Sequence, residues 1–261
     1  MQYEHLLLWR FGSGVYCSER FMLSIIIPTL NEERAIEQTL KNLRSIHSLL
    51  YEIIIADTKS TDRTRDIAEK YADTVVVYQG TKKPNAAIIR NLGATVAKGD
   101  VLLFQDADVI LKDADAFVVR VRDVLQKNPE FVALTVSTRV DSATATLMDG
   151  FMSWAINMSF IILNNVLHVG GASGECQIVR REAFDKVGGY DESLPVSEDA
   201  DLFQKLARVG RTRMLTDLLT VQSGRRQHAI GWPRLLLQWW GNWISVTFFH
   251  TSVTSHWEEI R

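Results

Sequence analysis

Two aspartates at the end of an apolar run are the residues of this sequence best suited to chemistry. Residues 101–106 have the composition of a buried strand, which delivers Asp106 and Asp108 at its end. In an extended backbone, residues two positions apart project to the same side. Two neighbouring carboxylates need a cation or a proton between them, and a hard divalent ion that keeps coordination sites for phosphate oxygens meets that need. The pair therefore predicts a metal site, although Asp-x-Asp also occurs as a polar strand end that caps a turn.

Alternating strands and helices would place this pair at the edge of a sheet. Apolar runs rich in β-branched residues predict strands at residues 24–28, 52–57, 74–78, 101–106 and 131–138. Helical spacing predicts helices at residues 33–48, 62–71, 85–98 and 114–128, with Asn31 and Asp62 as start signals of the first two. Such alternation indicates an α/β fold with a Rossmann-like, doubly wound, mostly parallel sheet. Ligands of these sheets bind outside the carboxyl ends of the strands, here residues 28–32, 57–62 and 106–108.

The alternation stops after Thr138. An apolar segment at residues 151–169 is interrupted by Ser, Asn and His, and it predicts an amphipathic or buried helix rather than a membrane span. A short strand at 176–179 and helices at 181–187 and 198–209 follow the glycine-rich loop at 170–174. Basic residues then dominate from Lys205 to Arg234. Acidic strand ends in the first half and basic residues in the second are what a site for a metal-bound anion requires.

Composition excludes several classes of protein. The 261 residues are 46% hydrophobic and carry a net charge of −2, which excludes a disordered chain and argues against a nucleic-acid-binding protein. Cys17 and Cys176 are the only cysteines, so a disulfide framework and a cysteine-rich zinc site are both excluded. The first residues show no secretory signal, and we therefore expect a cytoplasmic protein.

Five further motifs, taken in order, resemble a known family. They are Pro-Thr-Leu-Asn-Glu at 28–32, Ala-Asp-Thr-Lys-Ser at 56–60, the run from Lys83 to Ala94, Gly-Gly-Tyr-Asp-Glu at 188–192 and Ser-Glu-Asp at 197–199. With the Asp-x-Asp strand they resemble the family 2 inverting glycosyltransferases, over about residues 22–226. The resemblance implies a GT-A fold with a mixed acceptor-side half, a nucleotide-diphosphate-sugar donor, and Mn²⁺ or Mg²⁺ as cofactor.

The resemblance also implies roles for individual residues. Thr29, Glu32 and Asp57 match the nucleotide pocket, and Asp57 matches the residue that reads the nucleobase edge. Arg90 matches the nucleotide-side arginine of the helix before the Asp-x-Asp strand. Asp106 would contact the ribose and the metal, and Asp108 would hold the metal against the diphosphate. Asp199 matches the general base, although an acidic residue in the first turn of a helix is also ordinary.

The sequence departs from the family pattern in two places. Thr58-Lys59 stands where the family has Asp-Gly, so the base specificity is open. The Gln-x-x-Arg-Trp motif of processive synthases is missing, and residues 223–228 stand there instead, which favours a non-processive enzyme. Arg225 and Arg226 are candidates to bind a diphosphate or an anionic acceptor, because guanidinium groups match phosphate oxygens. His228 is a candidate third metal ligand, although a lone histidine is more often structural.

The sequence also suggests an organisation and leaves two alternatives open. We expect an N-terminal arm at residues 1–21 and a transferase domain at 22–230, with a nucleotide-binding half at 22–138 and an acceptor half at 139–230. The aromatic tail at 231–261 would either pack on the domain or make a peripheral contact with the inner face of a membrane. The acceptor could be a glycan, a lipid-linked molecule or a small molecule. The alternatives are a sugar-nucleotide nucleotidyltransferase, whose glycine-rich first loop is missing here, and an inactive relative that binds nucleotide sugars.

Overall fold

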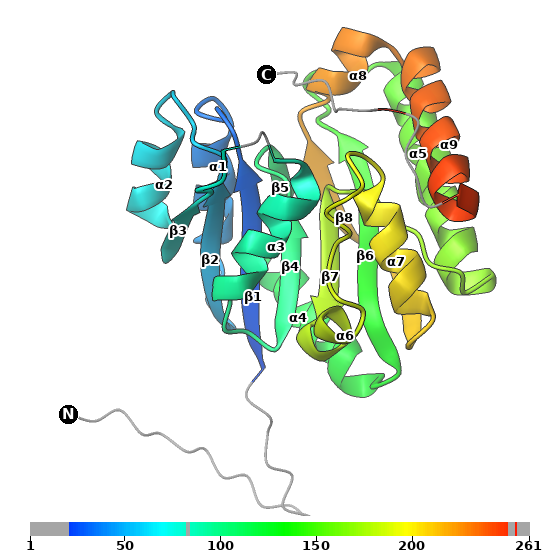
Figure 1. The fold of residues 1–261 in the computed structure, drawn as a ribbon, viewed down its shortest axis with the longest axis horizontal. Coiled ribbons are helices and arrows are strands. Elements are labelled where there is room, and N and C mark those ends of the chain that lie inside the picture. The colour runs from blue at the N-terminus through cyan, green and yellow to red at the C-terminus, as the bar shows by residue number, and fades with distance from the viewer. Residues whose placement is uncertain (1–20, 82–83, 250–253, 255–261) are drawn as a thin grey trace, which may run out of the picture.

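The apolar runs of the sequence form the strands of a single sheet (Figure 1). The computed structural model describes residues 21–81, 84–249 and 254. The strands among these residues are β1 (Met22–Thr29), β2 (Leu50–Asp57), β3 (Thr74–Val77), β4 (Val101–Gln105), β5 (Val109–Leu111), β6 (Phe131–Val140), β7 (Cys176–Arg180) and β8 (Arg211–Gln222). Their order is β3-β2-β1-β4-β7-β6-β8-β5. Four neighbouring pairs are parallel and three, β4–β7, β7–β6 and β8–β5, are antiparallel. The predicted α/β fold with a mostly parallel sheet is confirmed.

Helices cover both faces of this sheet. They are α1 (Ile36–Leu43), α2 (Thr64–Tyr71), α3 (Ala86–Val96), α4 (Ala114–Lys127), α5 (Leu147–Ile161), α6 (Arg181–Lys186), α7 (Glu198–Ala207), α8 (Arg225–Ile230) and α9 (Trp232–Phe249), with a π-helical turn, η1 (Ile162–Val166), after α5. In Figure 1, α3, α6 and α7 lie in front of the sheet and α4 lies behind it. None of the described helices is long and apolar enough to cross a membrane.

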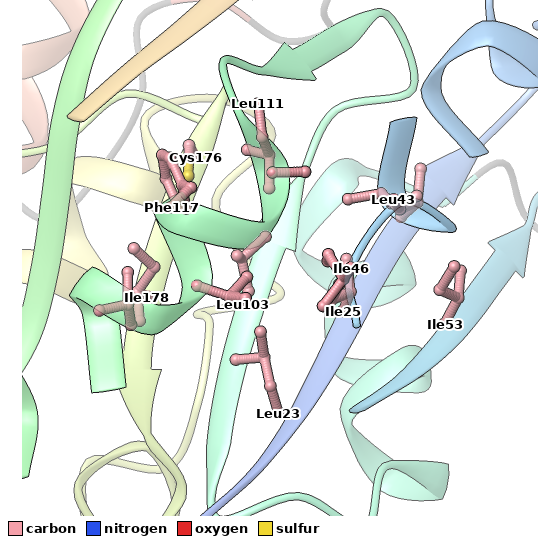
Figure 2. Close-up of a cluster of buried hydrophobic side chains, with 14 of the residues drawn as sticks. Leu23, Ile25, Leu43, Ile46, Ile53, Leu103, Leu111, Phe117, Cys176 and Ile178 are labelled. Atoms are coloured by element: carbon pink, nitrogen blue, oxygen red, sulfur yellow. The ribbon is translucent and has the colours of Figure 1, made fainter. Parts of the chain in front are cut away.

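The two-residue period of the strands divides the core into two hydrophobic clusters. Leu23 and Ile25 of β1 face one cluster, together with Phe117 of α4, as Figure 2 shows. Ile26, between β1 residues of the first cluster, faces the other, where it packs with residues of α3, α6 and α7. Because successive side chains of a strand point to opposite faces, near-continuous apolar strands fill both clusters at once.

The chain order creates a crevice at the carboxyl ends of β1 and β4. From β1 the chain moves outward to β2 and β3, and it then returns to place β4 on the other side of β1. Where the strand order reverses in this way, the loops after the two neighbouring strands border a crevice at the edge of the sheet. The loops after Thr29 and Gln105 therefore border an open space, and Asp106 and Asp108 lie in the second of these loops.

Several sequence-based expectations need correction. Asn31 does not start the first helix, which begins at Ile36; its side chain accepts a hydrogen bond from Thr61 N instead and links two loops. Much of the basic stretch forms the long strand β8, because apolar residues interleave its charges. Strands from both predicted halves share one sheet, since β7 lies between β4 and β6; the boundary at 138/139 stays a prediction.

The two terminal segments are only partly within the described residues. Residues 1–20 of the predicted arm lie outside them, and Phe21 packs against the first core cluster. In the aromatic tail, Trp232 and Leu235 are buried, which agrees with packing of α9 on the domain. Trp257 lies outside the described residues.

A buried carboxylate fastens the start of α5 to α8 and α9. Asp149 is only 1% exposed, and it accepts hydrogen bonds from Thr146 N and Thr146 Oγ1, each at 2.7 Å. It is also bonded to His228 Nε2 at 2.9 Å and accepts from Trp232 Nε1 at 2.7 Å. Burial alone would raise the pKa of Asp149, but these partners outweigh burial and hold the pKa well below its ordinary value.

We predict that Asp149→Asn lowers the melting temperature by several degrees. The amide replaces a carboxylate whose bonds join three helices, and loss of such bonds costs about 1–3 kcal/mol. A carboxyl group with a lowered pKa in the folded state stabilises the fold above its unfolded pKa, about 3.9, and loses that contribution as the pH falls through the folded value. Thermal unfolding from pH 7 down to pH 3 should therefore show a weaker loss of stability in the variant than in the wild type.

Asp217→Asn is the control, because Asp217 pairs with Arg120 on the exposed surface, where an ion pair contributes little. Equal melting temperatures for Asp149→Asn and the control would contradict the structural role of Asp149.

Candidate active site

A cavity of about 1090 Å³ lies outside the carboxyl ends of β1 and β4. It is lined by the loops after these strands and by residues of α3, α5, α7, α8 and α9. Eight of the residues predicted for the site line it: Thr29, Glu32, Arg90, Asp106, Asp108, Asp199, Arg225 and Arg226. Asp108 and Asp199, which are far apart in the sequence, therefore share one cavity.

Arg90 joins two acidic parts of this site. It lies on α3 with only 4% of its surface exposed, and its Nη1 donates to Glu198 Oε1 at 2.6 Å. Its Nη2 donates to Asp106 Oδ1 at 3.0 Å. Burial disfavours the charge, but Asp106 and Glu198 hold the pKa of Arg90 above its ordinary value. Arg90 is thus a cation fixed between the end of β4 and the start of α7.

Gly174 makes room for this arginine. Its carbonyl oxygen accepts from Arg90 Nη2 at 3.4 Å, and a Cβ atom at this position would lie 2.7 Å from the same nitrogen. The glycine-rich loop at residues 170–174 therefore lets the backbone approach the guanidinium closely.

Asp106 has an unusual protonation equilibrium. Burial raises its pKa to about 7 against the opposing effect of Arg90, and the carboxylates of Glu175 and Asp108 raise it further. The side chain is 38% exposed, but the exposed part faces the cavity. Glu175 also lines the cavity, and its Oε2 is buried without a hydrogen-bond partner among the described residues. This part of the site thus brings the carboxylates of Asp106, Asp108 and Glu175 close together.

Asp108 is held from the opposite side. It accepts hydrogen bonds from Ser223 Oγ and from Arg225, whose Nη2 lies 3.1 Å from Asp108 Oδ2. The same Nη2 contacts Glu32 Oε2 at 2.9 Å, at the end of the first loop. Burial opposes the charge of Arg225, but Asp108 and Glu32 keep its pKa above the ordinary value. Arg225 therefore connects the first-strand loop with the Asp-x-Asp loop.

Asp199 faces the cavity from the first turn of α7. Burial raises its pKa to about 8, and the neighbouring Glu198 adds to this, while Arg90 opposes it. Its Oδ1 accepts from Ala200 N at 2.8 Å. A carboxylate with a pKa near 8 is more basic than an ordinary one, and in its ionised form it can accept a proton as a general base must.

Asp57 lies beneath the cavity rather than in its lining. It is fully buried, and its carboxylate accepts from Thr29 Oγ1 at 2.9 Å and from Ser60 N at 2.8 Å. The adjacent Lys59 has a φ of 59° and donates to Gly80 O at 3.0 Å, so its charge is turned toward that loop. In the structure Asp57 holds together the loops that follow β1 and β2, and its reading of a nucleobase stays a prediction.

His228 is bonded to Asp149 and is not part of the cavity lining. No group of three or more His, Cys, Asp or Glu residues in the described part of the chain could hold a metal ion. The structure therefore brings Asp106 and Asp108 together without the predicted third ligand. Likewise, of the basic stretch from Lys205 to Arg234, it is Arg225 and Arg226 that line the cavity.

Sequence reasoning assigned no role to three residues that shape the site. They are Glu198, Glu175 and Ser223. Glu198 and Ser223 lie within the sequence segments singled out above, but the sequence did not indicate that Glu198 would bond Arg90 or that Ser223 would bond Asp108. Glu175 follows the glycine-rich loop, and no motif in the sequence singles it out.

Comparisons with known proteins identify the family of this chain. A family model described as glycosyl transferase family 2 matches residues 24–188. The succinoglycan biosynthesis protein ExoA of Rhizobium meliloti is 32% identical over 210 residues, which cover 74% of this chain and 60% of the relative. An uncharacterized glycosyltransferase of Haemophilus influenzae is 30% identical over 192 residues, covering 71% and 62%. The chain thus spans about three fifths of the length of these relatives.

Solved structures show the same fold. The mannosyltransferase PcManGT from Pyrobaculum calidifontis, in complex with GDP-Man and Mn²⁺, superposes with a TM-score of 0.62 at 20% identity, covering 79% of this chain and 58% of that one. TarS from S. aureus, in complex with UDP-GlcNAc, gives 0.60 at 20% identity, covering 77% and 59%. With the family model and the two relatives, these likenesses show that the chain belongs to glycosyl transferase family 2 and has its GT-A fold.

Proposed function

We propose that this protein transfers a sugar from a nucleoside-diphosphate sugar to an acceptor hydroxyl with inversion at the anomeric carbon. The observation that carries the proposal is that Asp106, Asp108, Asp199 and Arg225 line one cavity at the crevice between β1 and β4. Relatives in solved complexes hold UDP-GlcNAc or GDP-Man, which supports the donor class. A nucleotidyltransferase would instead bind a triphosphate through a glycine-rich first loop, and here that loop is Pro-Thr-Leu-Asn-Glu.

The donor's diphosphate would lie between the Asp-x-Asp loop and α8. Asp106 and Asp108 are hard oxygen donors, and the raised pKa of Asp106 indicates that a cation beside it would relieve unbalanced negative charge. These residues therefore fit Mn²⁺ or Mg²⁺, which when bound would stabilise the charge of the leaving diphosphate. Arg225 and Arg226 would add guanidinium contacts to phosphate oxygens. In the structure Arg225 bonds Asp108 and Glu32, so donor binding would redistribute these contacts.

Asp199 would act from the acceptor side of the cavity. The acceptor oxygen attacks the anomeric carbon while the bond from that carbon to the phosphate oxygen breaks. The hydroxyl proton moves to Asp199, and the electron pair of the broken bond leaves with the nucleoside diphosphate. A single displacement from the opposite face inverts the configuration and needs no covalent intermediate. Glu198 would keep Asp199 basic by its negative charge, while Arg90 fixes Glu198 in place.

We predict that binding of UDP or GDP requires a divalent ion. Isothermal calorimetry with Mn²⁺ should show affinity at least tenfold higher than with a chelator, because two carboxylates face the diphosphate and repel it without a cation. Asp108→Asn should weaken binding in Mn²⁺ to a similar extent. Asp141→Asn, which changes an exposed carboxylate outside the cavity lining, is the control. Equal affinities with and without the metal would contradict the proposed diphosphate site.

We predict that Asp199→Asn retains donor binding but loses at least a hundredfold in the rate of donor turnover, since an amide cannot accept the proton. The donor would be chosen by a thermal-shift screen of nucleotide sugars with Mn²⁺, and turnover measured as release of nucleoside diphosphate. Asp201→Asn is a matched control on the same helix, because Asp201 pairs with Lys205 and lies outside the cavity lining. Normal turnover by Asp199→Asn would remove this residue from the mechanism.

We predict that kcat/KM rises with pH up to about 8, because Asp199 accepts a proton only in its ionised form and its pKa is raised to about 8. Glu198→Gln should move this rising limb to lower pH, since a negative neighbour that raises the pKa is removed. Glu182→Gln changes an exposed residue of α6 and should leave the profile in place. A limb that stays at the same pH in Glu198→Gln would mean that another group titrates.

A further inference from the structure

Exposed apolar side chains are concentrated on α5 and the turn after it. Of the eleven large hydrophobic residues that are exposed in the described part of the chain, nine lie within residues 147–169. They are Leu147, Met148, Phe151, Trp154, Met158, Ile162, Val166, Leu167 and Val169, and we call them the apolar stripe. Leu147 is 97% exposed, Phe151 59% and Trp154 58%. Residues 147, 151, 154 and 158 are spaced three or four apart, so they lie on one face of the helix.

This outward face of α5 is apolar, whereas the outward face of an ordinary surface helix is polar or charged. A helix on a water-soluble domain directs charged residues outward. Residues 147–169 contain no Lys or Arg and a single acidic residue, Asp149, which is buried and bonded to Thr146, His228 and Trp232. A contiguous apolar surface on a protein indicates a site of contact with another apolar surface.

Apolar side chains of the same helix also line the cavity. They are Ile156, Phe160 and Leu163 of α5 and η1, together with Leu236 and Trp239 of α9, and we call the part of the cavity that they line the apolar arm. Asp106, Asp108 and the arginines of α8 line the same cavity, as described above. The sugar, ribose and diphosphate of a nucleotide sugar are polar, so these parts do not account for the apolar arm.

Two observations connect the arm with both the chemistry and the surface. Helix α7, which carries Asp199, packs against α9, so the proposed base lies beside the arm. Ile162 is both a lining residue of the cavity and an exposed member of the apolar stripe, 44% exposed. The cavity therefore reaches the stripe at Ile162. An amphiphile could place its polar end at Asp199 and its apolar chain along the arm.

We propose that the acceptor is a lipid-linked molecule, and that the apolar stripe lies on the membrane that supplies it. This rests on the proposed function, because it identifies the acceptor class of the same site. The hydrocarbon chain runs along the arm and leaves the protein at Ile162 into the bilayer. A bilayer would bury the apolar stripe and also receive the hydrocarbon chain that leaves the apolar arm. A protein partner or a second copy bound to the stripe would instead cover Ile162 and close this exit. Trp154 also suits the boundary between headgroups and acyl chains.

The arm is tested with two probes that have the same headgroup, octyl and methyl β-D-glucopyranoside, by calorimetry in the presence of UDP or GDP and Mn²⁺. Each buried methylene strengthens binding roughly fourfold, so the octyl compound should bind at least tenfold more tightly. Leu163→Asp should abolish this difference, and Leu50→Asp, which changes an exposed leucine at the start of β2, should preserve it. Equal binding of both probes, or a difference that persists in Leu163→Asp, would overturn the acceptor class.

The stripe is tested by sedimentation with phosphatidylcholine vesicles. The wild type should pellet with the vesicles, with little dependence on salt because the stripe carries no charge. The double variant Phe151→Asp/Trp154→Asp should remain in solution, while Leu50→Asp pellets like the wild type. Pelleting that survives the double variant, or a wild-type dimer in light scattering that the double variant separates, would overturn the membrane contact at α5.

Nucleoside-diphosphate binding with Mn²⁺ is measured on every variant. Intact nucleotide binding also serves as the check that each variant is folded. If it persists while the chain-length difference or the vesicle binding is missing in the wild type, the lipid inference fails and the proposed transferase function stands. If the wild type does not bind nucleotide, the proposed function itself fails.

Discussion

The buried guanidinium of Arg90 fixes the geometry of the whole site. It bonds Glu198 at 2.6 Å and Asp106 at 3.0 Å, and so ties the start of α7 to the end of β4 across the cavity. Removing one partner of a buried ion pair costs about 3–5 kcal/mol, because the other charge stays unpaired in a poorly solvated place. The residue that the motif suggested for the nucleotide side thus also positions the neighbour of the proposed base. The proposed metal site and the proposed base are therefore both linked to this one cation.

The sheet and most of the site could be predicted from the sequence because each rests on a local signal. Short apolar runs such as residues 101–105 favour buried strands, and ordered motifs place Asp106, Asp108 and Asp199 at strand or helix ends. The failures have a common cause in long-range contacts. Asn31 bonds the loop after β2, and His228 meets Asp149, which is 79 residues away. Strand β8 was not predicted, because the charged residues within it interrupt the alternation of apolar and polar residues that is typical of a strand.

The acceptor half was the hardest part to predict, for a physical reason. Hydropathy shows that residues 151–169 are apolar, but it does not show which side of a helix faces water. Burial of Asp149 turns the only acid of α5 inward and leaves Phe151 and Trp154 outward. Three-dimensional contacts were needed to see that one helix has an inner apolar wall and an outer apolar surface, joined at Ile162.

Gly174 limits which substitutions the glycine-rich loop can accept. A single added methyl group there would press against the guanidinium of Arg90, 2.7 Å away. Any side chain at position 174 would therefore also disturb the bonds of Arg90 to Glu198 and Asp106. Variation of this loop is better directed to Ser173, which lines the same cavity and already carries a side chain.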